Sequence, residues 1–288
     1  MPVRFSPVMA AKFWEHGGDF SAKSINLHER GELASPIFTL DDFRVRGEPF
    51  GPHSHAGFSA LTFVFEDTEA RARSRDSLGN DVEVGPGGIL WFQAARGAMH
   101  HEIPAGGNEL HGAQIFVKLS ARNKFIAPRT LWLDGSAVPE WQAKDGDRVR
   151  IVVGSFNNVS SPLVPAEPLD LLDVTLRSAI SFELKGGHHA LFYVREGGMR
   201  VHGDVGAAVV EAGHGVALSG TGECVTLEGS ARLLILSGAE MNEPVVTQGP
   251  FIMNNQAQIA AAVARFRAGE MGRLSPIQAT DTGNRSET

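Results

Sequence analysis

Residues 53–66 read His-Ser-His-Ala-Gly-Phe-Ser-Ala-Leu-Thr-Phe-Val-Phe-Glu, and this stretch sets the interpretation of the whole 288-residue chain. His53 and His55 lie two residues apart where an apolar run begins. Side chains two residues apart on a β-strand point to the same face. The stretch therefore predicts a buried strand that starts with two imidazoles facing one site.

The same order of elements occurs twice in the chain. After residues 53–66 come a Gly-Asn turn at 79–80 and Val-Gly-Pro-Gly-Gly-Ile-Leu-Trp-Phe at 84–92. Residues 186–197 read Gly-Gly-His-His-Ala-Leu-Phe-Tyr-Val-Arg-Glu-Gly, and Val-Glu-Ala-Gly-His-Gly-Val-Ala-Leu-Ser follows at 210–219. Two copies of one β unit are implied. This order of strand, glycine turn and Pro-x-Gly hairpin is similar to that of the cupin superfamily, so we expect two jelly-roll barrels.

The remaining pattern is that of an all-β protein with one short C-terminal helix. Apolar runs between glycine turns predict strands at 61–65, 89–92, 114–119, 148–153, 190–194, 216–218 and 231–236. The helix is expected from Gln256 to Ala268, with an asparagine at 254 or 255 as its N-cap and Gly269 at its end. We expect an N-terminal metal-binding domain over 1–130, a linker over 131–144, a metal-free C-terminal domain over 145–272 and a flexible tail over 273–288.

The composition narrows the class of protein and its surroundings. The formal net charge of -7 disfavours direct nucleic-acid binding, which depends on basic residues that displace counterions. The sequence has no long apolar run that would predict a membrane segment and no secretory leader pattern. The single cysteine, Cys224, cannot form an internal disulfide, and we expect it to be buried. A cytoplasmic location is the default expectation.

A second pair of residues repeats the spacing of the first. His100 and Glu102 are also two residues apart, so they would present an imidazole and a carboxylate in one direction. If the barrel brings the two pairs together, three nitrogens and one oxygen converge without a thiolate. That ligand set suits one divalent ion such as iron, manganese, nickel or copper. His101 should point the opposite way and stay outside the site.

Ordinary polar residues at strand ends remain the alternative for each pair taken alone. In the second copy, His188 and His189 are adjacent and should face opposite sides of their strand, so they cannot chelate as a pair. This is why we expect the second barrel to be metal-free. His111 and Gln114, on the strand after the ligands, are candidates for orienting a ligand or a substrate, with simple strand packing as their alternative.

Several ordered segments resemble the pirin family over nearly the whole chain. They are Pro-Ile-Phe-Thr-Leu-Asp-Asp-Phe at 36–43, His-Ser-His-Ala-Gly-Phe at 53–58, Arg-Asp-Ser-Leu-Gly-Asn at 75–80, Ala-Arg-Gly-Ala-Met-His-His-Glu-Ile-Pro at 95–104, His-Gly-Ala-Gln-Ile-Phe-Val at 111–117 and Glu-Pro-Val-Val-Thr-Gln-Gly-Pro-Phe-Ile-Met-Asn at 243–254. The resemblance implies a bicupin with one metal ion, Fe(II) in the first instance, at His53, His55, His100 and Glu102.

The resemblance also implies two alternative functions. One is a dioxygenase of the quercetin 2,3-dioxygenase type, which would take a flavonol-like or other small aromatic substrate together with dioxygen, and in which Glu102 would accept a proton. The other is a non-enzymatic, iron-dependent regulatory protein that binds a protein partner. Fold similarity does not decide between them.

Overall fold

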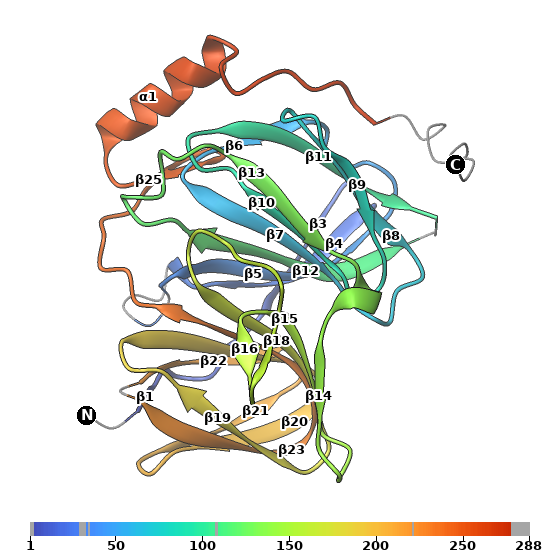
Figure 1. Cartoon of the computed structure of the whole chain (residues 1–288), viewed down its shortest axis with the longest axis vertical. Helices are drawn as coiled ribbons and strands as arrows, with labels where there is room; N and C mark the ends of the chain where they lie inside the picture. The colour runs from blue at the N-terminus through green and yellow to red at the C-terminus, as the bar shows by residue number, and fades with distance from the viewer. Residues whose placement is uncertain (1–2, 29–32, 34, 107–108, 221, 278–288) are drawn as a thin grey trace. The chain divides into compact units, whose positions relative to one another are not determined.

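The computed structural model describes residues 3–28, 33, 35–106, 109–220 and 222–277 (Figure 1). The chain folds into two compact units. Unit 1 comprises Met1–Phe13, Lys23–Asp41 and Val138–Asn242, and unit 2 comprises Trp14–Ala22, Asp42–Ala137 and Glu243–Thr288. The segments of the two units thus interleave along the chain, whereas the sequence predicted the contiguous ranges 1–130 and 145–272.

Most of the strands that surround the histidine pairs belong to two sheets. The first has seven strands in the order β13-β10-β7-β12-β5-β4-β3, and the second has four in the order β6-β11-β8-β9. Their bounds are β3 Lys12–His16, β4 Phe20–Asn26, β5 Ile37–Val45, β6 His53–His55, β7 Phe58–Val64, β8 Arg71–Asp76, β9 Asp81–Val84, β10 Ile89–Gln93, β11 Ala98–Ala105, β12 Leu110–Lys118 and β13 Arg129–Leu133.

The seven-stranded and four-stranded sheets enclose one apolar core, whose members all belong to unit 2. Phe43 of β5, Val64 of β7 and Leu90 of β10 contribute to it from the seven-stranded sheet, and Ala72 of β8 and Val84 of β9 from the four-stranded sheet. Inward-facing side chains that meet from two sheets define a sandwich of the jelly-roll kind. In Figure 1, β11, β8 and β9 form one layer and β7, β10 and β13 lie in the other.

Unit 1 is built on a ten-stranded sheet with the central order β1-β22-β20-β23-β18-β15-β14. β2 and β21 pair with β22 and β20, and β19 pairs with β23. A second apolar core, which includes Ile151, Val174, Phe192 and Ile235, fills this barrel. The bounds are β1 Arg4–Phe5, β2 Met9–Ala10, β14 Glu140–Gln142, β15 Arg148–Val153, β16 Ser155–Phe156, β17 Val159–Ser160, β18 Leu169–Leu176, β19 Ala179–Leu184, β20 His188–His202, β21 Ala207–Glu211, β22 His214–Ser219 and β23 Glu223–Ala239.

The helix and the seven predicted strands are confirmed. Each predicted strand overlaps a strand of the structure, from β7 for 61–65 to β23 for 231–236. Helix α1 spans Gln256–Arg267, and the side chain of its N-cap Asn255 accepts a hydrogen bond from the backbone of Gln258. Two short strands, β24 (Val246–Gln248) and β25 (Phe251–Met253), precede it. The fold is thus all-β with two cupin barrels and one C-terminal helix.

Three segments differ from what the sequence suggested. The expected linker 131–144 includes most of β13, the short helix η2 (Gly135–Ala137) and β14. β13 is an edge strand of the seven-stranded sheet, and β14 is an edge strand of the ten-stranded sheet. Ile277, in the expected tail, is buried, while residues 278–288 lie outside the described residues. The expectation that Cys224 is buried was wrong: the side chain is exposed, because its neighbour Val225 takes the inward-facing position on β23.

In the part of the chain that the structure describes, none of the helices has the length and hydropathy of a membrane span.

Gly57 allows the chain to turn between β6 and β7, and its replacement should be costly. Its φ is +87°, and a Cβ at this position would lie 1.9 Å from the carbonyl oxygen of Ile252. Gly79 has a similar φ of +97° but no heavy atom within 4 Å of the same position. Gly79→Ala should therefore cost about 1–2 kcal/mol of backbone strain. Gly57→Ala should cost at least about 2 kcal/mol more, because the clash adds to the strain.

The free energy of unfolding of both variants, from urea titration, checks this prediction. Equal losses in the two variants would mean that the contact with Ile252 does not constrain the turn.

Candidate metal centre

Strand pairing brings three of the predicted ligands together. β6 runs antiparallel to β11, with His53 opposite His100 and His55 opposite Ala98. Residues directly opposite each other on paired strands share a face, and so do residues two apart on one strand. The imidazoles of His53, His55 and His100 therefore project to the same side, with the small Ala98 leaving space beside His55.

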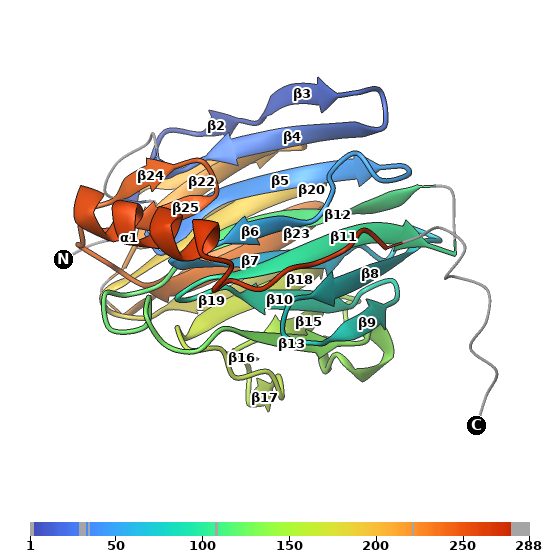
Figure 2. The same cartoon turned by 90° about the horizontal axis from the view of Figure 1, so that it is seen from above.

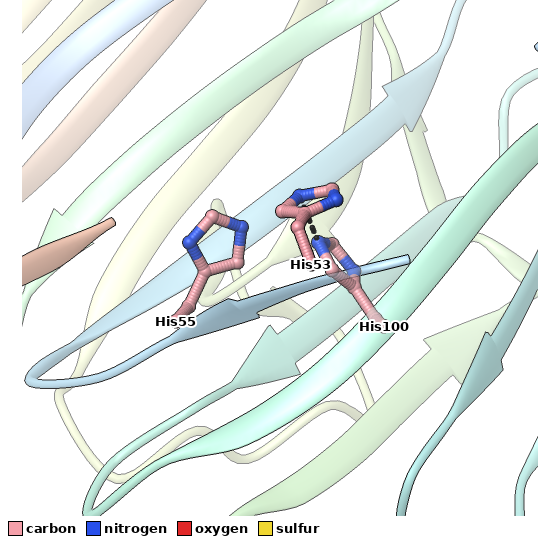
Figure 3. A group of neighbouring side chains, drawn as sticks. All are labelled: His53, His55 and His100. Carbon is pink, nitrogen blue, oxygen red and sulfur yellow. Dashed lines mark hydrogen bonds between the residues drawn. The ribbon is translucent and has the colours of Figure 1, made fainter. Parts of the chain in front are cut away.

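The three imidazoles form a compact cluster (Figure 3). One ring nitrogen from each lies within 4.8 Å of the others. Nε2 of His100 is 3.1 Å from Nε2 of His53, and Nδ1 of His53 is 2.9 Å from the carbonyl oxygen of Gly51. A histidine ligand commonly donates its second ring N–H to a backbone carbonyl, which fixes the tautomer that leaves the other nitrogen free to bind a metal. The contact with Gly51 gives His53 that arrangement.

Burial keeps the cluster uncharged. It lowers the pKa of His53, and it lowers the pKa of His55 to about 3 with a smaller contribution from His53. Burial, followed by the neighbouring imidazoles, also places the pKa of His100 well below its ordinary value. All three rings are then neutral near pH 7, which is the form that binds metal ions.

The protein alone does not satisfy this cluster. Nδ1 of His55 and Nδ1 of His100 are buried and have no hydrogen-bond partner. Leaving a buried polar atom unpaired costs about 1–3 kcal/mol. Neutral imidazoles with unsatisfied nitrogens fit a divalent cation of the iron, manganese, nickel or copper kind, so the residues present are compatible with the group that the sequence predicted.

Glu102 lies beside the cluster but is not one of its three members. Its Oε1 is 3.8 Å from Nδ1 of His100, and its Oε2 accepts a hydrogen bond of 2.8 Å from the hydroxyl of Thr62. Burial raises the pKa of Glu102 to about 7, and the hydrogen bond from Thr62 opposes that rise. The side chain is still 19% exposed, so solvent reaches this carboxyl group.

Thr62 connects Glu102 to Gln114. Two oxygen atoms lie within hydrogen-bond distance of the hydroxyl of Thr62: Oε2 of Glu102 at 2.8 Å and Oε1 of Gln114 at 3.1 Å. The hydroxyl has one hydrogen, so the two acceptors share it. The amide nitrogen of Gln114 donates to the carbonyl of Leu61 at 2.9 Å, which fixes the orientation of the amide. Gln114 therefore reaches the site through Thr62, a residue that the sequence analysis did not single out. A hydroxyl within the apolar run 58–64 was the available clue.

Aromatic rings form the wall behind the imidazoles. The ring of Phe92 stacks on that of His100, with centroids 4.5 Å apart and planes inclined by 9°. Phe58 and Phe116 contact His55 at centroid distances of 4.9 and 5.8 Å. These rings hold the imidazoles in place and lower the local polarity, which strengthens electrostatic interactions at the site. Phe116 is only partly buried, so one wall remains accessible.

The C-terminal segment braces the strands that carry the ligands. Ala56, next to His55, pairs with Phe251 of β25, and the two belong to a small core with Ile259 of α1. Farther along, the backbone of Ile277 donates to Nδ1 of His101 at 2.9 Å. Figure 2 shows α1 beside β25 and the chain after it running along β11. His101 is thus engaged on the side away from the cluster, in the direction predicted for it.

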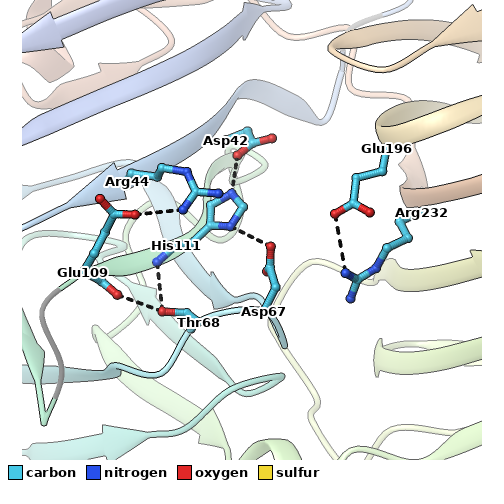
Figure 4. Close-up of polar contacts among 8 residues, drawn as sticks. All are labelled: Asp42, Arg44, Asp67, Thr68, Glu109, His111, Glu196 and Arg232. Carbon is cyan, nitrogen blue, oxygen red and sulfur yellow. Dashed lines mark hydrogen bonds and ion pairs between the residues drawn. The ribbon is translucent and has the colours of Figure 1, made fainter.

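His111 lies in a different polar cluster (Figure 4). Its Nδ1 is 3.0 Å from Asp67 and its Nε2 is 2.9 Å from Asp42, so both ring nitrogens are occupied. Its backbone N–H also donates to Thr68. In this arrangement both ring nitrogens of His111 contact carboxylates. These contacts do not support the prediction that His111 orients a metal ligand or a substrate.

The fold and the histidine cluster together define the class: a two-barrel cupin with a candidate metal centre in one barrel. Residues 19–117 match the family described as pirin, and residues 171–272 match the pirin C-terminal cupin domain. The chain belongs to the pirin family.

Two relatives illustrate the range of names within this family. A Pseudomonas aeruginosa protein with a provisional quercetin 2,3-dioxygenase name is 31% identical over 83% of this chain and 87% of its own length. Human pirin is 28% identical over 87% of each chain.

Solved structures agree on the fold. A quercetin 2,3-dioxygenase from Acinetobacter baumannii has a TM-score of 0.83 at 23% identity and covers 94% of this chain and 99% of its own. The bacterial pirin YhhW from Escherichia coli in complex with nickel(II) has a TM-score of 0.63 at 18% identity, with 83% of this chain and 99% of its own covered. At these identities the likeness extends to the two-barrel architecture.

The stability that His111 contributes should depend on pH. Burial disfavours its charged form, but the two flanking carboxylates outweigh burial and raise its pKa above 6.5. A raised pKa in the folded state adds stability that is complete below the unfolded pKa and is lost as pH rises through the folded one. His111→Gln should therefore cost more unfolding free energy at about pH 6 than at about pH 9.

Urea unfolding at the two pH values measures the difference. Asp67→Asn removes one of the two carboxylates. In this variant, the cost of His111→Gln in unfolding free energy should differ less between the two pH values than it does in the wild type. The same cost of His111→Gln at both pH values would contradict the assignment of a charged His111.

Proposed function

We propose that this protein is a metal-dependent dioxygenase that acts on a flavonol-like or other small aromatic substrate. The observation that carries the proposal is the convergence of three neutral imidazoles, two of them with a buried nitrogen that has no hydrogen-bond partner, beside a carboxyl group on one side of β6 and β11. His53, His55, His100 and Glu102 would hold one ion. Fe(II) is the first choice, with manganese, nickel and copper as alternatives. The dioxygenase names of similar proteins support the same reading.

The residues around the cluster suit an aromatic substrate with an acidic hydroxyl. When bound, the ion supplies Lewis acidity, which lowers the pKa of a substrate hydroxyl. Phe116, partly exposed beside His55, offers a face on which an aromatic ring can stack. Glu102, held by the hydroxyl of Thr62, is placed to accept the proton that leaves the substrate. Gln114 keeps Thr62 and hence Glu102 oriented.

Metal binding should stabilise the folded chain. An ion that binds only the native state at a concentration of about 100 times its dissociation constant adds about 2.7 kcal/mol. Nickel(II), added to protein stripped with a chelator, should raise the melting temperature of the wild type and of His214→Ala, a change on β22 outside the cluster. His55→Ala should show little or no rise.

Elemental analysis of the same samples should give close to one ion per wild-type chain. A rise in melting temperature that survives both His55→Ala and His100→Ala would place the ion elsewhere and overturn the assignment.

Turnover should require Glu102. With quercetin as substrate, the iron-loaded wild type should consume oxygen, and Glu102→Gln should lower the rate by about a hundredfold or more, the usual contribution of a general base. Glu83→Gln, on the partly exposed strand β9, is the matched control and should keep wild-type turnover. Metal content should be measured for each variant, so that a lost ion is not mistaken for a lost base.

Two results would count against this proposal. Metal-loaded protein that consumes no oxygen with iron, manganese, nickel or copper across a panel of flavonols would favour the alternative, an iron-dependent regulatory protein that binds a protein partner. Full turnover in Glu102→Gln would remove the carboxylate from the mechanism.

A further inference from the structure

The second barrel contains a pocket of its own. It has a volume of 240 Å³ and lies entirely within unit 1. Its polar lining includes Asp170, Lys185, His188 and Ser237, and its apolar lining includes Leu163, Val164, Pro165 and Pro168. None of these residues belongs to the histidine cluster of the first barrel.

Strand alternation explains why polar groups gather there. His188 lies two residues before Ala190 on β20, and Asp170 lies two residues before Leu172 on β18. Ala190 and Leu172 belong to the barrel core, so His188 and Asp170 face the interior. Ser237 holds the corresponding inward position on β23, two residues after Ile235. The pocket is therefore the polar end of an otherwise apolar barrel interior.

The charge that a ligand can reach in this pocket is positive. Oδ1 of Asp170 accepts from the backbone N–H of Ser155 at 3.1 Å, and Oδ2 accepts from Nζ of Lys185 at 2.9 Å. The side chain of Asp170 is only 8% exposed, whereas that of Lys185 is 46% exposed. An ammonium group has three donors, and the contact with Asp170 uses one of them. Lys185 can thus donate to an anionic group while Asp170 holds it in place.

His188 adds a second polar group. Its Nδ1 is buried and has no hydrogen-bond partner. The adjacent His189 faces the other way and contacts the carbonyl of Ser35 at 3.0 Å. This Nδ1, in the same pocket as an ammonium group, offers a further hydrogen bond to a bound molecule after a small rotation of the ring.

Much of the apolar lining comes from one loop. Leu163, Val164, Pro165 and Pro168 lie between β17 and β18 and cover one side of the pocket. Val164 is 72% exposed, so most of its side chain is open to solvent. A small ligand in the pocket would bury this apolar surface and gain the corresponding hydrophobic free energy.

We propose that the second barrel binds a small organic carboxylate with a short apolar body, whose carboxylate contacts Lys185 and His188 and whose body packs against Val164 and the adjacent prolines. A water molecule occupies about 30 Å³ of liquid, so 240 Å³ accommodates a ligand of roughly eight heavy atoms. Benzoate and 3-methylbutanoate are of this size. The site is independent of the metal in the first barrel.

Ligand-observed NMR titration of the full chain tests the proposal. Benzoate and 3-methylbutanoate should bind, and the neutral analogue benzamide should bind at least about tenfold more weakly, because it lacks the charge-assisted contact with Lys185. Lys185→Met should weaken benzoate binding by a similar factor. Lys144→Met, which removes an exposed lysine of the same unit, should leave it unchanged.

Two further variants keep the test decisive. Because Lys185→Met removes the ion-pair partner of Asp170 and could destabilise the fold, Val164→Asp serves as a second change at an exposed position and should also weaken benzoate binding by repulsion. His55→Ala should bind benzoate as the wild type does, because the metal cluster takes no part.

The proposal would be overturned by any of the following results. They are no binding of either carboxylate at about 10 mM, affinity unchanged by both Lys185→Met and Val164→Asp, or benzoate binding that is lost in His55→Ala. Tighter binding of benzylammonium than of benzoate would likewise contradict it, because Asp170 would then be the group that the ligand contacts.

Discussion

The antiparallel register between β6 and β11 is the constraint on which the candidate metal centre depends. It sets His53 opposite His100 and the small Ala98 opposite His55, so that three rings converge without a clash. A shift of one residue would turn His100 away and present His101 in its place, because side chains alternate along a strand. The bond from Ile277 to His101 and the pairing of Ala56 with Phe251 both oppose such a shift.

The same register leaves buried nitrogens without hydrogen-bond partners, which costs folding free energy and indicates a bound ligand. Three imidazoles are packed among phenylalanine rings, and two of their nitrogens have no partner. Proteins tolerate such unsatisfied groups mainly where function requires them. Glu102, in contrast, has a hydrogen-bond partner and is partly exposed: Thr62 and Gln114 hold it at the edge of the cluster, where solvent still reaches it. Rigid nitrogens are suited to bind an ion, and one accessible carboxyl group beside them is suited to accept a proton.

Part of this arrangement could be predicted from the sequence, and part depends on contacts that a sequence does not display. Period-two spacing was enough to direct His53 and His55 to one face and to separate His188 from His189. The partnership of Thr62 with Glu102 could not be foreseen, because it requires that β7 and β11, in different sheets, face each other. Strand β8, Arg71–Asp76, carries too many charges to resemble a strand and is held by pairing with its neighbours and by contacts such as that of Arg73 with Asp81. The contacts of His111 with Asp42 and Asp67 could not be foreseen either, because the two carboxylates come from distant segments of the chain.

The two barrels share one fold but differ in the side chains at their polar sites, which is why fold alone does not assign their chemistry. The most direct test of the metal centre is anomalous X-ray diffraction from crystals of protein loaded with one ion, recorded at the absorption edge of that metal. A single peak about 2.0–2.3 Å from nitrogens of His53, His55 and His100 is the expected result. No peak at the cluster, or a peak coordinated by other residues, would contradict the assignment.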